Sequence, residues 1–305
     1  MQEASRIHAS SNPPRAIARV SGVDVAQLVL LAGLWGGSFV FMRVAAPAFG
    51  PVPLVALRVA VAAFILAPFL RLPDWRHMAP RLAWLGVVNS ATPFALFAHA
   101  ALHLPAGFSA ILNATAALWA VAIGWGLFGQ AVDGRALAGV VAGVVGVMCM
   151  VGPQLVWSRQ VDDGTAVAVA AAVAATVCYG YAAHYSRQHL SGVPSRSIAA
   201  GSLLPAAVVL AFPGLWLWPE ARPSSPAVAC AVALGALSTA WAYLLYFDLI
   251  QRIGAARAMT VTLMVPAFGV LLGLLFLGEA LSFSTVIGGA LVLLGCVLAL
   301  GGRSK

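Results

Sequence analysis

Two sets of side chains that could bind a solute recur in this sequence with the same helical spacing. Asn89, Thr92 and His99 lie at positions i, i+3 and i+10 of one apolar stretch, which places them on one face of a helix. The same spacing recurs 149 residues later with three further residues, Ser238, Trp241 and Asp248. Amide, hydroxyl and indole groups can hold a small solute, and a histidine or an aspartate could also carry a proton. The two faces are therefore predicted to face each other across one cavity.

Five other residues join this predicted cavity. Trp35 and Ser38 share one face of the first apolar stretch, and Tyr179 stands 144 residues after Trp35 at a corresponding position. Asn113 lies on another partly polar face, and Thr262 follows it at the offset of 149. These five residues are predicted to contact the same solute.

Each of these residues also has a purely structural interpretation. His99 lies near one end of its stretch, where it would meet water or lipid headgroups. Asp248 could pair with Arg252 at i+4 on the helix surface. Trp35 and Trp241 could pack in the core or face lipid. The sequence leaves these alternatives open.

Two further charged residues have a structural interpretation that is favoured over a functional one, which would be proton carrying for Glu279 and ligand binding for Arg58. Glu279 lies in a short turn and is expected to accept backbone N–H bonds at the start of the following helix. Arg58 lies within an apolar stretch, where a buried charge is costly, and is expected to bond carbonyl groups at a helix end.

The sequence lacks the patterns on which catalysis or metal binding would depend. It has no GxSxG, HExxH or SxxK motif, and its six histidines do not cluster. The only lysine, Lys305, excludes a GxxxxGK[ST] phosphate loop and a Schiff base within the apolar stretches. The four cysteines fit neither a disulfide framework nor a CxxC metal site. We therefore expect no catalytic residue, no metal and no cofactor, and a protein that is not an enzyme.

Composition indicates what surrounds the chain. Hydrophobic residues make up 62% of it and charged residues 9%, with a mean hydropathy of +0.95. Because soluble domains contain about 25% charged residues, most of this surface is expected to face lipid or other apolar helices. The net charge of +8 comes from scattered arginines rather than a basic stripe. A lipid bilayer is therefore the expected partner, and no nucleic acid is expected.

Ten apolar stretches are predicted to be membrane-spanning helices, because each is about long enough to cross ~30 Å of hydrocarbon and a helix satisfies its own backbone. They are residues 23–43, 52–70, 82–102, 106–127, 135–152, 165–186, 197–217, 226–249, 256–278 and 282–301. The expected fold is an all-α integral membrane protein of ten transmembrane helices. Its predicted parts are a tail (1–22), a five-helix repeat (23–152), a linker (153–164), a second five-helix repeat (165–301) and a tail (302–305).

The two halves are predicted to be an inverted repeat. At the offset of 149 five glycines coincide, where about 1 coincidence is expected by chance. The pairs are Gly86 with Gly235, Gly124 with Gly273, Gly129 with Gly278, Gly139 with Gly288, and Gly146 with Gly295. A cytoplasmic N-terminus puts 13 Lys and Arg residues on the cytoplasmic side and three outside. An odd number of spans per half then inverts the second half and leaves both termini cytoplasmic.

The candidate residues fall on spans one, three, four, six, eight and nine, which are predicted to surround the cavity. Spans five and ten carry closely spaced glycines, namely Gly139 and Gly143 in one and Gly288, Gly289 and Gly295 in the other. Because small residues let helices approach closely, spans five and ten are predicted to pack together as a support.

The chain resembles the drug/metabolite transporter superfamily, specifically its EamA-type members. The resemblance rests on Leu34–Ser38 (LWGGS), on Pro51 to Arg58 at the start of the second span, and on Pro266 with Leu277–Glu279 (LGE) in the ninth. It covers nearly the whole chain after the first tail.

The first half departs from the family pattern at two positions. Ala117 stands where the family proline is usual, and Gln130 stands where the family glutamate is usual. A mechanism that needs both glutamates is therefore in doubt for this chain. The resemblance implies export of small metabolites, amino acids or cationic drugs across an inner membrane by alternating access.

We therefore expect a secondary transporter in the inner membrane that exports small metabolites, with amino acids as the favoured class. The modestly polar and aromatic lining suits zwitterions, although aromatic walls would also accept flat organic cations, as in a multidrug exporter. A different class, an intramembrane enzyme or a channel, is a further alternative. The working expectation for assembly is a monomer, and the driving force is open between proton antiport and the solute's own gradient.

Overall fold

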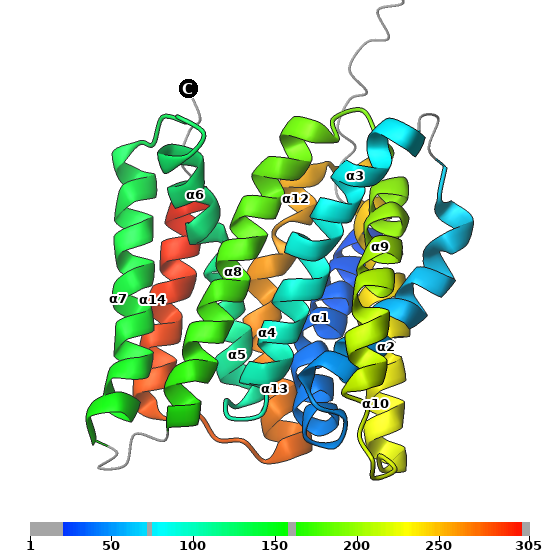
Figure 1. Cartoon of the computed structure of the whole chain (residues 1–305). Coiled ribbons are helices and arrows are strands. Elements are labelled where there is room, and N and C mark those ends of the chain that lie inside the picture. Colours follow the sequence, from blue (N-terminus) through cyan, green and yellow to red (C-terminus); the bar gives the residue numbers. More distant parts are fainter. Residues whose placement is uncertain (1–20, 72–74, 158–162, 301–305) are drawn as a thin grey trace, which may run out of the picture.

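The computed structural model describes residues 21–71, 75–157 and 163–300, and every regular element in these ranges is a helix (Figure 1). In these ranges seven helical stretches are long and apolar enough to cross a membrane: Gly22–Phe49, Pro51–Phe69, Ala106–Gly126, Gly134–Val151, Gly164–His189, Ser195–Trp216 and Ser225–Ile253. Two shorter apolar helices are Val261–Leu277 and Phe283–Ala299. An all-helical, multi-pass membrane fold is thus confirmed, and the count of ten spans stays a prediction.

The helices follow one another with short connections. The first half contains α1 (Gly22–Phe49), α2 (Pro51–Leu66), η1 (Ala67–Phe69), α3 (Trp75–Gly86), η2 (Val87–Ala91), α4 (Thr92–Ala100), α5 (Ala106–Ala114), α6 (Ala116–Gly126) and α7 (Gly134–Trp157). The second half contains α8 (Asp163–His189), α9 (Ser195–Trp216), α10 (Ser225–Gly235), η3 (Ala236–Trp241), α11 (Ala242–Ile253), α12 (Ala255–Ala258), α13 (Val261–Leu277) and α14 (Phe283–Leu300). The predicted tails lie outside the described residues except for residues 21 and 22. Of the predicted linker, residues 153–157 belong to α7 and residues 163–164 to α8, so the linker between the halves is shorter than expected.

Some predicted spans contain more than one element. Residues 75–100 run through α3, η2 and α4, and residues 225–253 run through α10, η3 and α11. The fourth predicted span changes direction at Thr115, whose hydroxyl donates to the carbonyl of Leu112 at 2.7 Å. The ninth is divided, because a turn separates α12 from α13.

The elements η2 and η3 are π-helices at equivalent positions of the two halves. Their first residues, Val87 and Ala236, are 149 positions apart. In η3 the Thr239 hydroxyl donates to the carbonyl of Leu234 at 2.8 Å, five residues earlier. After η2, Pro93 lacks an N–H group to continue the ordinary α-helical bonding, which favours the wider turn before it. The repeat therefore extends from glycine positions to an unusual local conformation.

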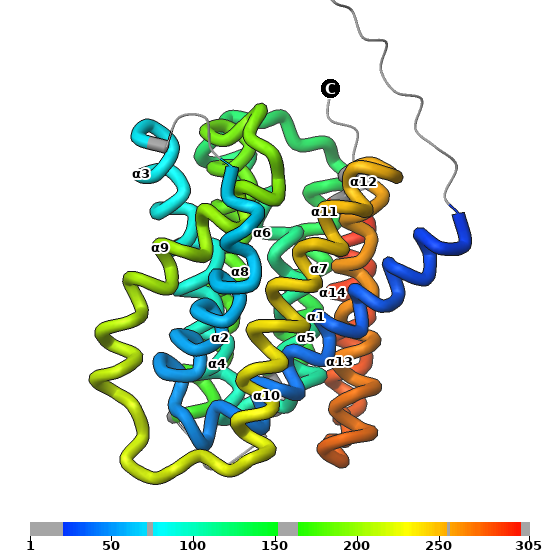
Figure 2. Tube along the Cα trace, turned by 90° about the vertical axis from the view of Figure 1, so that its right-hand side faces the viewer, coloured from blue at the N-terminus to red at the C-terminus, as the bar shows by residue number. Residues whose placement is uncertain are grey.

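The first helix of each half packs against the other half. α1 contacts α13, α10 and α11, and α8 contacts α4 and α6. α2 packs against α10 as well as α9, and α9 packs against α3. The two halves are therefore interleaved around the centre of the molecule rather than joined along one face (Figures 1 and 2).

Helices α7 and α14 form a closely packed pair at one side (Figure 1). A Cβ atom added at Gly139 would lie 2.6 Å from the carbonyl oxygen of Gly295, and one added at Gly146 would lie 2.6 Å from that of Gly288. No side chain fits between the two backbones at these points. The predicted close packing of spans five and ten is confirmed.

The equivalent turns of the two halves lie at opposite ends of the bundle. The α6–α7 turn is at the top of Figure 1, and the α13–α14 turn is at the bottom. The α8–α9 turn lies at the same end as the α6–α7 turn, whereas the α4–α5 turn lies at the end of the α13–α14 turn. A cavity between the halves can therefore be bounded differently at its two ends.

Candidate functional site

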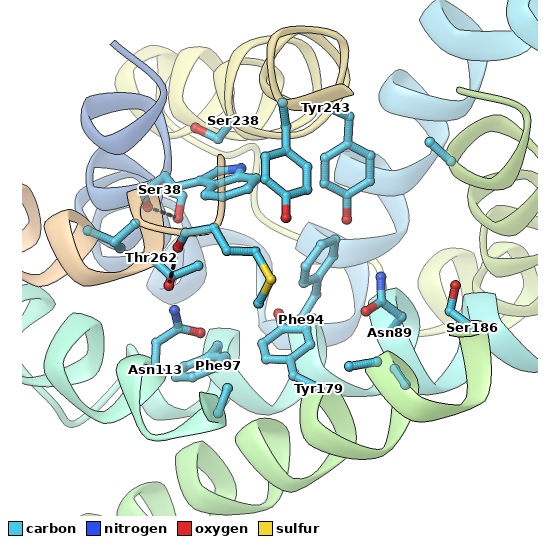
Figure 3. Close-up of a pocket in the computed structure, with 18 of the residues that line it drawn as sticks. Ser38, Asn89, Phe94, Phe97, Asn113, Tyr179, Ser186, Ser238, Tyr243 and Thr262 are labelled. Atoms are coloured by element: carbon cyan, nitrogen blue, oxygen red, sulfur yellow. Dashed lines mark hydrogen bonds between the residues drawn. The ribbon is translucent and has the colours of Figure 1, made fainter. Parts of the chain in front are cut away.

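A cavity of about 520 Å³ lies between the two halves, within the range of about 300–1,000 Å³ that is usual for small-molecule sites. Its walls come from α1, α2, α5, α6, α8, α9, α11 and α13, and from residues in or beside both π-helices. Figure 3 shows Asn113, Tyr179 and Tyr243 projecting into this space from three different helices. The cavity therefore depends on both halves of the chain.

Seven of the residues predicted to contact a solute line this cavity: Trp35, Ser38, Asn89, Asn113, Tyr179, Ser238 and Thr262. The hydroxyls of Ser38 and Thr262 donate to their own helices, to Trp35 O at 2.6 Å and to Met259 O at 2.8 Å. Each hydroxyl keeps lone pairs that a solute donor could reach. Ser238 is fully buried, and its hydroxyl has no partner among the described residues.

The other four predicted residues lie outside the cavity. Thr92 is exposed on the outer surface, and Trp241 is 44% exposed. His99 is partly buried, and its ring lies 5.9 Å from that of His103. Asp248 forms an ion pair. These four side chains do not face the space that the other seven share.

The ion pair of Asp248 differs from the structural alternative that the sequence suggested. Its partner is Arg196 at the start of α9, not Arg252 on its own helix. Arg252 instead contacts Asp24 in the first turn of α1, with 3.3 Å between the charged atoms. The two ion pairs thus join α11 to α9 and to α1, whereas the i, i+4 spacing would have paired Asp248 with Arg252 within α11.

The π-helices explain why Thr92 and Trp241 point away. A π-turn takes up one extra residue, which rotates everything after it by about 100° relative to a regular helix. The residues that enter the cavity after Asn89 are therefore Phe94 and Phe97, at i+5 and i+8. After Ser238 the equivalent lining residues are Tyr243 and Tyr246, also at i+5 and i+8. The same displacement in both halves identifies one common cause.

These rotated residues form two related aromatic contacts. The rings of Phe97 and Tyr179 stack with centroids 6.3 Å apart, and those of Trp35 and Tyr246 lie 5.3 Å apart. Each contact joins the first helix of one half to the third span of the other half. The aromatic walls could have been found from sequence, because Phe97 and Tyr246 are 149 residues apart.

Arg58 lines the cavity, although the sequence favoured a structural role for it over ligand binding. Its side chain is 5% exposed, Nε donates to the Thr239 hydroxyl at 3.0 Å, and Nη1 lies 3.8 Å from Met42 Sδ. The guanidinium carbon sits 3.6 Å from the centroid of the Phe94 ring. Contrary to the prediction, Arg58 bonds no helix-end carbonyl among the described residues. A buried arginine at mid-helix costs about 2.5–3.5 kcal/mol in membrane insertion, so its place beside a cavity is informative.

The helix-end carbonyls are bonded instead by Arg43, near the end of α1. Its Nη1 donates to Ala101 O at 2.8 Å and to Leu102 O at 2.9 Å. Its Nε lies 3.3 Å from Oε1 of Glu279, which accepts the N–H group of Ala106 through Oε2 at 2.7 Å. Glu279 therefore caps the start of α5. The sequence had suggested that it would cap the helix that follows it, α14. Met42 and Phe97, the lining residues nearest to these contacts in the chain, are only 3% and 2% exposed, which indicates that this end of the cavity is closed.

The other end of the cavity reaches the surface. Its lining there includes Ala183, which is exposed, together with Ser186 and Ser195 on either side of the α8–α9 turn. Ser186 lies at the edge of the cluster in Figure 3. Among the described residues no group of three His, Cys, Asp or Glu side chains could hold a metal ion. The site is thus a one-ended pocket whose lining includes a single charged residue, Arg58.

Comparison with known proteins places this architecture. The sequence matches the EamA-like transporter family over residues 25–152 and again over residues 166–301. The chain belongs to this family. The two matched segments coincide with the two halves whose π-helices and aromatic contacts correspond.

Two relatives with named roles and one solved structure are similar to most of the chain. A probable amino-acid metabolite efflux pump of Escherichia coli (strain K12) is 23% identical, covering 90% of this chain and 94% of that protein. A probable terminal-alkyne amino-acid exporter of Streptantibioticus cattleyicolor is 25% identical, covering 89% and 91%. A protein of known crystal structure is 19% identical with a TM-score of 0.61, covering 91% and 96%, and shows the same fold. The matches therefore span most of this chain and most of each of these proteins.

Proposed function

We propose that this protein is a secondary transporter that exports small metabolites, amino acids in particular, across the inner membrane by alternating access. The observation that carries the proposal is the central cavity, built by both halves, closed at one end and reaching the surface at the other. Alternating access requires such a site at the interface of two repeats. Two relatives named as a probable amino-acid exporter and a probable amino-acid metabolite efflux pump support amino acids as the substrate class.

The proposed topology has ten spans in two inverted halves, with both termini in the cytoplasm. The opposite positions of the equivalent α6–α7 and α13–α14 turns support it. The positive-charge bias assigns the end with the α8–α9 turn, which carries Arg187 and Arg196, to the cytoplasm. The cavity then opens inward, so that a metabolite would enter from the cytoplasm before release outside.

The alternatives receive less support. A channel would need a continuous path, whereas the Arg43–Glu279 contacts close one end of this cavity. An intramembrane enzyme would need a nucleophile and a base in contact, and the lining has no histidine, cysteine or carboxylate. An organic-cation exporter could use the aromatic lining, but the only charge in this lining is positive and would repel a cation.

Transport by purified protein in liposomes tests the proposal. We expect saturable counterflow of at least one amino acid from a panel of twenty, with no ionic conductance. Asn113→Ala should lower the counterflow rate at least about tenfold, because it removes an amide from the cavity wall. Cys230→Ala, which changes a residue outside the lining, is the control and should leave the rate unchanged. Conductance that does not saturate would contradict a carrier.

A further inference from the structure

We propose that Arg58 binds the carboxylate of the transported solute, so that the cavity selects acids and zwitterions over organic cations. This inference rests on the proposed transport function and specifies its substrate class. Arg58 is the only charged residue among those that line the cavity, and only 5% of its surface is exposed. A site whose single charge is positive attracts an anionic group and repels a cation.

The guanidinium has hydrogen-bonding capacity that the protein leaves unused. An arginine carries five N–H donors. Arg58 gives one to the Thr239 hydroxyl at 3.0 Å, and Nη1 has only the thioether sulfur of Met42, a weak acceptor, at 3.8 Å. Among the described residues no carboxylate pairs with Arg58, and Nη2 has no acceptor. A carboxylate in the cavity would accept from this outer edge of the guanidinium, where a planar, bidentate contact is favourable.

Contacts from both halves hold the guanidinium in place. The Thr239 hydroxyl donates its own proton to Leu234 O at 2.8 Å, so it is oriented to accept from Arg58. On another side, the Phe94 ring packs 3.6 Å from the guanidinium carbon. Thr239 lies within one π-helix, and Phe94 follows the other. The π-helices therefore fix the orientation of the one charged group in the site before a solute binds.

Comparison with Arg43 separates a structural arginine from a binding one. Arg43 bonds two backbone carbonyls through Nη1 and contacts the carboxylate of Glu279 through Nε, so its charge is paired within the protein. Arg58 fastens α2 with a single oxygen contact and otherwise faces the cavity lining. The aromatic rings of Trp35 and Tyr179, also in the lining, supply faces that can hold the ammonium group of a zwitterion.

Competition by charge-modified analogues tests the inference on the unchanged protein. The probe is labelled L-phenylalanine, chosen because the lining is aromatic, in counterflow with 3-phenylpropanoate or phenethylamine as competitor. 3-Phenylpropanoate keeps only the carboxylate, and phenethylamine keeps only the ammonium. We expect 3-phenylpropanoate to compete at least about tenfold better than phenethylamine, the ratio typical of one charge-assisted contact. Equal competition, or stronger competition by phenethylamine, would overturn the inference.

Two substitutions test Arg58 itself. Arg58→Gln should remove the preference for the carboxylate analogue, whereas Arg58→Lys should retain part of it because the charge remains. Arg135→Gln removes the same charge from the exposed first turn of α7 and should leave the preference unchanged. If Arg58 only fastened α2, Arg58→Gln would slow transport of both analogues by the same factor and keep their ratio, which would overturn the proposal.

Binding without transport separates failure of this inference from failure of the proposed function. Thermal unfolding of the purified protein is measured with each analogue at increasing concentration. Stabilisation by 3-phenylpropanoate, lost in Arg58→Gln, would support the anchor even if no amino acid were exchanged, and only the amino-acid substrate would then be wrong. Amino-acid counterflow with no dependence of preference on Arg58 would support the transporter and overturn the anchor.

Discussion

The α6–α7 and α13–α14 turns share a backbone conformation and differ in side-chain chemistry. Gly129 and Gly278 have φ values of 62° and 65°, in the left-handed region that favours glycine. The N–H group of the next residue, Gln130 or Glu279, donates to a carbonyl six residues earlier, at 2.9 Å and 3.2 Å. The two turns thus have the same backbone conformation, but one carries a carboxylate, Glu279, where the other carries an amide, Gln130.

The carboxylate and the amide contact different partners. Glu279 joins Arg43 of α1 to the first N–H group of α5, and Arg43 also bonds the last carbonyls of the α4 segment. Gln130 lies 3.3 Å from His184 Nδ1, and Nε2 of this histidine lies 2.7 Å from Ala120 O. The charged set connects four elements, whereas the neutral set connects α8 only to α6 and its turn.

The difference matches the shape of the cavity. At the Glu279 end the first helix is tied across to α4 and α5, and the cavity is closed. At the Gln130 end no α8 side chain bonds the equivalent carbonyls of Ile250 and Gln251 among the described residues. Ion pairs there join α11 to α1 and α9 and leave α8 out. Two turns with equivalent backbones therefore hold the two ends of the cavity with different strength.

Removing the carboxylate should have the largest effect. Glu279→Ala deletes the contact with Arg43 and the cap of α5, each a charge-assisted interaction of about 1.5–3 kcal/mol. We expect at least about tenfold slower counterflow and a clearly lower midpoint of thermal unfolding. Gln130→Ala, the matched change at the other end, should cost less than about 1 kcal/mol. Equal losses in the two variants would contradict the asymmetry.

Converting one closure into the other should have a smaller effect. Glu279→Gln removes the charge but keeps an acceptor for the Ala106 N–H group. We expect it to open the closed end more often, and the measurement is labelling of a cysteine introduced by Ser38→Cys in a cysteine-free chain. An impermeant thiol reagent added from the closed side should react about three- to tenfold faster than without Glu279→Gln, as a loss of about 1 kcal/mol implies.

The reverse conversion should act at the open end. Gln130→Glu with His184→Arg places a charged pair where the amide and imidazole now meet. Labelling of the same cysteine from the open side should slow by about twofold, since an exposed pair contributes about 0.2–1 kcal/mol. No change from the open side together with slower labelling from the closed side would show that the two turns do not control separate ends.

Part of the fold and of the site could be predicted from the sequence. The offset of 149 predicted that both halves contribute to one cavity, and it correctly paired Asn89 with Ser238 and Asn113 with Thr262 on its wall. The all-helical membrane fold followed from composition alone.

The failures have one main physical cause. Sequence periodicity assumes 3.6 residues per turn, and each π-helix breaks that assumption in the middle of its span. Thr92 and Trp241 were therefore placed on the wrong face, and Phe94 and Tyr243 were missed. Long-range partners are the second cause, since no local spacing shows that Arg58 meets Thr239 or that Glu279 meets Ala106.

The smallest expected effect concerns the glycine beneath each turn. A Cβ added at Gly273 would lie 3.0 Å from Oε2 of Glu279. One added at Gly124 would lie 2.8 Å from Oε1 of Gln130 and 3.0 Å from Cε1 of His184. The Glu279 carboxylate is held on both oxygens, whereas the Gln130 amide oxygen has no partner among the described residues and can move.

Alanine at these glycines should therefore act differently in spite of the similar distances. Replacing a helical glycine gains about 0.5–1 kcal/mol of helix propensity, as expected for Gly126→Ala, where nothing lies within 4 Å. At Gly124 the Gln130 amide and the His184 ring would both be displaced, but they make only neutral contacts, so the gain should offset more of the cost and the loss should be smaller than at Gly273. At Gly273 the displaced carboxylate would lose its contacts, so we expect a net loss of about 1 kcal/mol by chemical denaturation. A loss of unfolding free energy at Gly124 as large as that at Gly273 would contradict this difference. It would mean that both side chains are held equally firmly, because a side chain that can move avoids the added Cβ at little cost.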